Sequence, residues 1–78
     1  MRVVLEAAEV KVQDGRILWV RSGQRRYAID RTLERFECGG RWWRGEFPRS
    51  YFVLVAQNCV MLEVYLEVLE WTLSAIQD

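Results

Sequence analysis

Turn signals recur at short intervals along this chain, and they constrain its fold more than any other feature of the sequence. The pairs are Asp14-Gly15, Ser22-Gly23, Gly39-Gly40 and Gln57-Asn58. Frequent turn signals in a short chain are typical of an antiparallel sheet or a small barrel. The 78 residues suffice for one domain, 1–78, and the hydrophobic fraction of 51% argues against disorder. We therefore predict an all-β domain, a small antiparallel sheet or barrel of five or six strands.

The clearest turn signal is the Asp-Gly pair at residues 14–15. Val10 and Val12 precede it with a period of two, and Ile17 and Trp19 follow it with the same period. An Asp-Gly pair flanked in this way is the strongest short-range signal for a β-hairpin. A two-residue turn places Val12 opposite Ile17. The next pair is then Val10 with Trp19, and all four side chains share one face.

Two segments fit a helix and a strand equally well. Residues 30–37 fit a short helix capped by Asp30, or a continued strand with a bulge that places Asp30, Thr32, Glu34 and Phe36 on one face. Residues 60–78 show leucines at helical spacing, but valines also alternate with glutamates as in a strand. An α+β fold with a C-terminal helix is therefore the alternative. Residues 51–56 are apolar on both sides, which predicts a central, doubly covered strand.

The formal net charge is zero, but the charges are unevenly distributed. Residues 16–49 hold nine arginines against four carboxylates, whereas residues 50–78 hold four carboxylates and no arginine or lysine. The arginines between residues 21 and 35 could follow a phosphate backbone, or they could pair with nearby carboxylates and the acidic tail. Because dedicated nucleic-acid-binding domains are usually basic overall, the balanced total favours ion pairs.

The sequence lacks the residues of a recognisable enzyme. It contains no histidine, which is the commonest general base and a frequent metal ligand. Glu63, Glu67 and Glu70 have a spacing that suits a solvated face better than a catalytic pair. Cys38 and Cys59, without histidine or a second pair of cysteines, do not make a zinc site. We therefore expect no enzymatic activity, no metal and no cofactor.

Cysteine usage and hydropathy indicate the compartment. Two cysteines are fewer than a secreted disulfide framework usually has, so we expect free thiols, buried or half-buried, in a reducing cytosol. No apolar run is long enough for a signal peptide or a membrane span. We expect a cytoplasmic protein that does not contact a membrane.

The segment at residues 41–44, which reads Arg-Trp-Trp-Arg, is the strongest candidate for a binding site. On a strand, Trp42 and Trp43 point to opposite faces, so that one fills the core and the other is exposed or covered by another element. An exposed tryptophan beside arginine suits stacking on single-stranded nucleic acid, and the same pairing is common in protein-interface hot spots. Both tryptophans could also pack inside, under the arginine stems. The candidate binding residues are Arg41, Trp42, Trp43, Arg44, Arg49 and Tyr51.

The C-terminal part carries more apolar surface than one small sheet needs. Residues 64–71 include two valines, two leucines, a tyrosine and a tryptophan. This segment could complete the core, form a homodimer contact or extend a sheet edge to edge. A homodimer is therefore a possible assembly.

A series of motifs extends over nearly the whole chain: VQDGR (12–16), WVR (19–21), RRY (25–27), LERF (33–36), GRWWRGE (40–46), PRSYF (48–52) and WTLSAIQD (71–78). In this order they resemble a family of small bacterial domains that occur alone and at the C-terminus of ImuB-type homologues of translesion DNA polymerases. The family usually has a glycine-containing turn before the last tryptophan strand, whereas residues 68–70 here are Val-Leu-Glu. The resemblance implies an all-β domain and, by genomic association, a role near DNA repair or mutagenesis.

Together these features predict a non-catalytic interaction module, or adaptor, that binds a protein partner in a setting of DNA repair or mutagenesis. The alternative is a module that binds single-stranded nucleic acid through the central arginine and tryptophan face.

Overall fold

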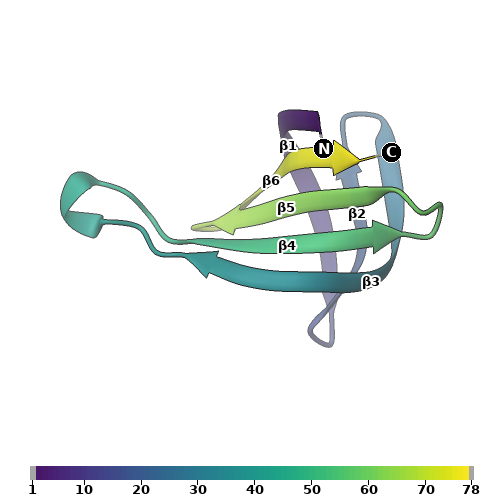
Figure 1. Cartoon of the computed structure of the whole chain (residues 1–78), viewed down its shortest axis with the longest axis horizontal. Coiled ribbons are helices and arrows are strands. Elements are labelled where there is room, and N and C mark those ends of the chain that lie inside the picture. Colours follow the sequence, from purple (N-terminus) through teal and green to yellow (C-terminus); the bar gives the residue numbers. More distant parts are fainter. Residues whose placement is uncertain (1, 78) are drawn as a thin grey trace.

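The computed structural model describes residues 2–77, which form a closed antiparallel barrel of six strands (Figure 1). Each strand pairs with the next along the chain, and the last pairs with the first. The strands are β1 (Arg2–Gln13), β2 (Arg16–Ser22), β3 (Arg25–Cys38), β4 (Arg49–Ala56), β5 (Met61–Glu67) and β6 (Glu70–Gln77). The all-β prediction is confirmed, and the alternative C-terminal helix is not formed, because β5 and β6 occupy that segment.

Helical structure within residues 2–77 is limited to η1 (Trp42–Arg44), one turn of 3-10 helix between β3 and β4. No helix in this range has the length and apolar character that crossing a membrane requires.

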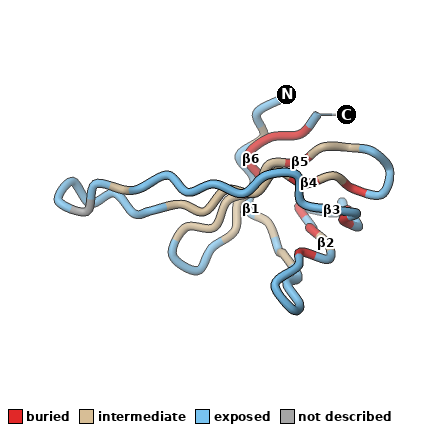
Figure 2. The backbone as a smooth tube through the Cα atoms, turned by 60° about the horizontal axis from the view of Figure 1, so that its bottom comes forward, coloured by how far each residue is buried: buried red, intermediate tan, exposed pale blue. Residues whose placement is uncertain are grey.

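The core lies inside the barrel, where alternate side chains of neighbouring strands meet. Its largest fully buried side chains are Val20, Leu54, Leu62, Val64 and Leu73, from β2, β4, β5 and β6. Figure 2 shows the buried segments gathered in the barrel, whereas the long ribbon of β3 and β4 is exposed or half-buried beyond it. Burial of the alternate apolar positions is the main force that closes so small a sheet.

The β1–β2 hairpin turns at Asp14 and Gly15 as predicted, with φ angles of 52° and 75° that suit a type I′ turn. Val12 lies opposite Ile17, also as predicted. The prediction for Trp19 was wrong, because a bulge between Lys11 and Val12 shifts the register and places Trp19 opposite Lys11. A shift of one residue moves a side chain to the other face of the sheet, so Trp19 lies outside the barrel.

Residues 30–37 form part of strand β3 and not a helix, so the second of the two alternatives is correct. The pairing of β3 with β4 has two register shifts. Glu34 lies opposite Val53 on the outer face, but Thr32 lies opposite the buried Leu54 on the inner face. The prediction that Asp30, Thr32, Glu34 and Phe36 share one face was therefore wrong, because Leu33 is an extra residue that reverses the alternation.

β4 is a central strand between β3 and β5, as predicted, but one of its two faces has no second layer in the described part of the chain. Leu54 and Ala56 are buried on the inner face, whereas Tyr51, Val53 and Val55 on the outer face are half-buried. The outer side chains are covered only by their neighbours in the sheet.

Both cysteines are free thiols, as predicted, but both are exposed. Cys38 ends β3 on the ribbon that leaves the barrel, and Cys59 lies in the loop between β4 and β5. The expectation of buried or half-buried thiols was wrong because neither position faces the core.

The β5–β6 hairpin turns on Val68 and Leu69, between the paired residues Glu67 and Glu70. Val68 has a φ of 59°, in the left-handed region that β-branched residues rarely adopt. The β2–β3 turn has the same length and a φ of 61° at the same position, but there the residue is Gly23. Two turns of one barrel therefore differ in whether the strained position carries glycine or valine.

We expect Val68→Gly to raise the free energy of unfolding by about 1 kcal/mol. Relief of a strained left-handed residue is worth about 1–3 kcal/mol, which exceeds the entropic cost of glycine of about 0.5–1 kcal/mol. The reverse change at the matched position, Gly23→Val, should lower the stability because of the left-handed backbone, although an added Cβ there meets no atom within 4 Å. Urea denaturation followed by tryptophan fluorescence measures both. If Val68→Gly leaves the free energy of unfolding unchanged, the strain relieved at Val68 does not exceed the entropic cost of glycine.

Candidate functional site

The Arg-Trp-Trp-Arg segment does not form a strand, which corrects the prediction. Residues 42–44 form η1 at the far end of the β3–β4 ribbon (Figure 1). The Arg44 N–H donates a hydrogen bond to the Arg41 carbonyl oxygen at 2.8 Å, and this local bond closes the turn. The two tryptophans therefore do not alternate between the faces of a sheet.

Three of the predicted binding residues lie together at this end of the ribbon. Arg41, Trp43 and Arg44 are all exposed, and Trp43 has 67% of its surface accessible. The side chain of Trp42 lies outside the described residues. The turn thus presents an indole and two guanidinium groups to solvent.

A compact loop holds η1 at the end of the ribbon. The Arg41 N–H donates to the Glu46 carboxylate at 3.2 Å, and the Glu46 N–H donates to the Arg41 carbonyl oxygen, also at 3.2 Å. Gly40 packs against the backbone of Phe47, where an added Cβ would lie 2.4 Å from the carbonyl carbon. The loop is therefore fixed by backbone contacts that need glycine at position 40.

The other two predicted residues, Arg49 and Tyr51, lie on β4 and contact each other. The Arg49 guanidinium donates to the Tyr51 hydroxyl at 3.3 Å and to the Glu67 carboxylate at 2.6 Å, and it lies 4.5 Å from the centre of the Tyr65 ring. The bonds to Tyr51 and Glu67 raise the pKa of Arg49 above its ordinary value. The Arg49 side chain is thus fixed in its position on the sheet by contacts with three neighbouring residues.

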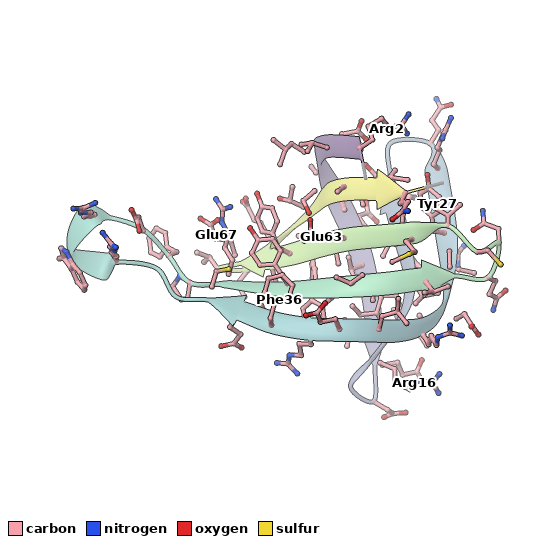
Figure 3. The ribbon with its side chains drawn as sticks, viewed as in Figure 1. Arg2, Arg16, Tyr27, Phe36, Glu63 and Glu67 are labelled. Atoms are coloured by element: carbon pink, nitrogen blue, oxygen red, sulfur yellow. The ribbon has the colours of Figure 1, made fainter. Side chains whose placement is uncertain are left out.

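An aromatic row crosses the outer face of the sheet beside Arg49. Phe36, Tyr51 and Tyr65 lie directly opposite one another on β3, β4 and β5. Phe36 stacks on Tyr51 with ring centres 5.0 Å apart, and Tyr51 contacts Tyr65 at 5.2 Å. Figure 3 shows Phe36 at the β3 end of this row. The sequence analysis missed Phe36 and Tyr65, because only the strand register brings them beside Tyr51.

Carboxylates flank the aromatic row. Glu34 and Glu63 lie on either side of Val53 in the next row of the sheet, and Glu67 lies beside Arg49 in the row on the other side (Figure 3). Negative charges next to the rings repel a polyanion. Arg49 neutralises Glu67, so the net negative charge beside the three rings comes from Glu34 and Glu63.

The glutamates of β5 do not form a catalytic pair. Glu63 and Glu67 are four residues apart on one strand, which separates their Cα atoms by about 13 Å. The Ser74 hydroxyl donates to Glu63 at 3.0 Å, and Arg49 donates to Glu67. Over residues 2–77, no three His, Cys, Asp or Glu side chains gather where they could hold a metal ion.

The contacts found for the arginines between residues 21 and 35 lie within one strand or between neighbouring strands. Arg21 pairs with Glu9, Arg31 lies 3.3 Å from Asp30, and Arg35 lies 3.9 Å from Glu37. Arg26 also lies over the Trp19 ring at 4.7 Å. Three of these arginines thus form the ion pairs that one of the two interpretations expects.

Large apolar side chains are exposed on the β5–β6 hairpin and on two segments beside it, the β3–β4 loop and β1. We call Leu5, Phe47, Val68 and Leu69 the apolar tip. Leu69 has 89% of its surface accessible, Val68 and Leu5 each have 63%, and Phe47 has 58%. Of the apolar residues in the segment 64–71, Val68 and Leu69 are exposed, Val64 is fully buried and the others are half-buried. The sequence did not place the exposed pair on a turn.

Two shallow grooves join the members of the apolar tip. A groove of about 400 Å³ lies between Phe47 and the hairpin residues Val68 and Leu69. A second groove of about 890 Å³ runs from Leu69 past Leu5. The second groove is also lined by Val10, Trp19, Tyr65 and Trp71. The four residues of the apolar tip thus belong to one connected surface.

Comparisons with protein-family models, with curated proteins and with solved structures found no match to this chain. The resemblance to the small bacterial domains therefore stays a prediction. The functional conclusions rest on the chemistry and geometry of the chain itself.

We expect Gly40→Ala to destabilise the protein by about 1–3 kcal/mol, because the new methyl group overlaps the Phe47 backbone. Gly39→Ala is the matched control, since a Cβ there meets nothing within 4 Å. Urea titrations of the two variants measure the difference. If both variants unfold at the same midpoint, the loop does not depend on the close approach at position 40.

Proposed function

We propose that this protein is a non-catalytic interaction module that binds a protein partner through the apolar tip. The single observation that carries the proposal is the β5–β6 turn. Val68 keeps a left-handed conformation that glycine would adopt without strain, and Leu69 beside it is almost fully exposed. Strain and apolar exposure at one site both lower the stability or solubility of the free protein. A binding role explains why they occur together.

Contacts at the base of the β5–β6 hairpin hold the apolar tip in place. The backbones of Glu67 and Glu70 are paired at the base of the hairpin, and Arg49 on the neighbouring strand binds the Glu67 carboxylate, which offsets its repulsion by Glu70. A rigid surface loses little conformational entropy when a partner docks. The aromatic residues Tyr65 and Trp71 line the adjoining groove, and such residues are enriched in protein interfaces.

The resemblance described above supplies the biological setting of the proposal. Domains of that family accompany homologues of translesion DNA polymerases. We therefore place the proposed adaptor near DNA repair or mutagenesis, with a protein of that machinery as its partner.

A photo-crosslinking residue at position 69 tests the proposed binding surface. In native lysate, it should give a discrete adduct that the same residue at the exposed position 57, in the β4–β5 turn, does not give. An excess of unlabelled wild-type protein should remove the adduct. The double variant Val68→Gly, Leu69→Ser should not compete, because it lacks the apolar tip. Equal competition by the double variant would refute the proposal.

A second candidate function is binding of single-stranded nucleic acid by η1. It is favoured by one observation, the exposed Trp43 between the exposed Arg41 and Arg44. An indole offers a stacking surface for a base, and the guanidinium groups offer contacts to phosphate.

For this second candidate we expect oligonucleotides to quench the tryptophan fluorescence saturably, more weakly at physiological salt than at low salt. Arg44→Ala should abolish the quenching, whereas Arg16→Ala on the distant β1–β2 hairpin should leave it unchanged. A flat titration of the wild-type protein at both salt concentrations would exclude the nucleic-acid candidate.

A further inference from the structure

The outer half of β3 has one unpaired edge. β3 pairs with β2 only through residues 25–28, and from Ile29 to Cys38 its partner is β4. Among the described strands, none pairs with the other edge of residues 30–38. Figure 1 shows this edge as the free lower border of the ribbon, with the β1–β2 hairpin farther from the viewer.

The last part of this edge is regular enough to accept another strand. Residues 34–38 pair with β4 in an unbroken register, beyond the two bulges of β3. Alternate residues of such an edge direct their backbone N–H and C=O groups away from the sheet, where they can bind a further strand. All of residues 34–38 are exposed.

The side chains of this segment are complementary to themselves. In an antiparallel pairing of two copies centred on Phe36, Arg35 of one copy lies opposite Glu37 of the other, and this pair occurs twice by symmetry. In the free chain Arg35 and Glu37 lie only 3.9 Å apart, so they share one face of the sheet as such a pairing requires. Registers centred on Glu34 or Arg35 instead place like charges opposite each other, which disfavours them.

We propose that two copies of this chain associate edge to edge through residues 34–38 of β3, antiparallel and centred on Phe36. In addition to the Arg35–Glu37 pairs, the dimer gains a contact on the outer face of the sheet, because Phe36 of each copy lies beside Phe36 of the other. The row of Phe36, Tyr51 and Tyr65 continues across the two-fold axis, and aromatic cross-strand pairs stabilise sheets.

This homodimer does not depend on the proposed function, because the apolar tip takes no part in it. The antiparallel arrangement directs the β3–β4 loops of the two copies in opposite directions. Both apolar tips therefore remain available to other proteins.

Charge reversal at the paired positions tests the dimer and its register. Analytical ultracentrifugation under reducing conditions, up to millimolar concentration, should show a monomer–dimer equilibrium for the wild-type protein. Arg35→Glu and Glu37→Arg should each weaken it by about tenfold or more, because each places like charges opposite each other twice. Arg2→Glu, at the exposed start of β1, makes the same charge change as Arg35→Glu and should have no effect.

Two further measurements are specific to the proposed register. The double variant Arg35→Glu, Glu37→Arg should recover the wild-type dissociation constant. An equimolar mixture of the two single variants should form a heterodimer, because both of its pairs between positions 35 and 37 are again opposite in charge. Circular dichroism confirms that each variant is folded.

A wild-type protein that remains monomeric at every concentration would overturn the proposal. So would a dimer that neither charge reversal weakens, or one that is lost in the Val68→Gly, Leu69→Ser variant. The last result would place the contact on the apolar tip instead of the β3 edge.

Discussion

The fold depends on two long strands that each change partner partway along their length. β1 pairs with β6 through residues 2–8 and with β2 through residues 9–13, and β3 passes from β2 to β4 in the same way. These two strands bend the sheet around the core, and bulges occur in both. A short chain thereby surrounds its largest buried side chains without a second layer.

The same construction determines the surface of the protein. β3 continues beyond the point where it leaves β2, so the outer half of the β3–β4 ribbon lies outside the barrel. The aromatic row there is formed by contacts between adjacent strands. Arg49 on β4 contacts Tyr51 on the same strand and Tyr65 and Glu67 on β5, so it links two neighbouring strands. Beside this ordered patch, the β5–β6 turn exposes apolar residues in a strained conformation. A rigid base with an apolar end is the arrangement on which the interaction proposal rests.

Much of the fold could be predicted from local sequence. The predictions that were wrong have a common physical cause. The Asp14-Gly15 turn was correct because its geometry is set by two residues. The position of Trp19 and the faces of β3 were wrong because bulges arise from barrel closure, which is a property of the whole sheet. The Val68-Leu69 turn was uncertain because its tight geometry lacks the glycine that usually marks it. Of the candidate site, Arg49 and Tyr51 do meet, but their neighbours Phe36 and Tyr65 come from strands that local patterns cannot align.

The pairing of β1 with β6 also brings the start of β1 beside the end of β6. Arg2 lies opposite Ile76, at the end of the molecule away from the β3–β4 loop (Figure 1). A peptide that bridged these ends would be short, so the chain could be circularly permuted, with new termini in the exposed turn at residues 57–58 and all six strand pairings kept. For the same reason, a tether attached at either end would leave the barrel from the same side and leave the opposite end unobstructed.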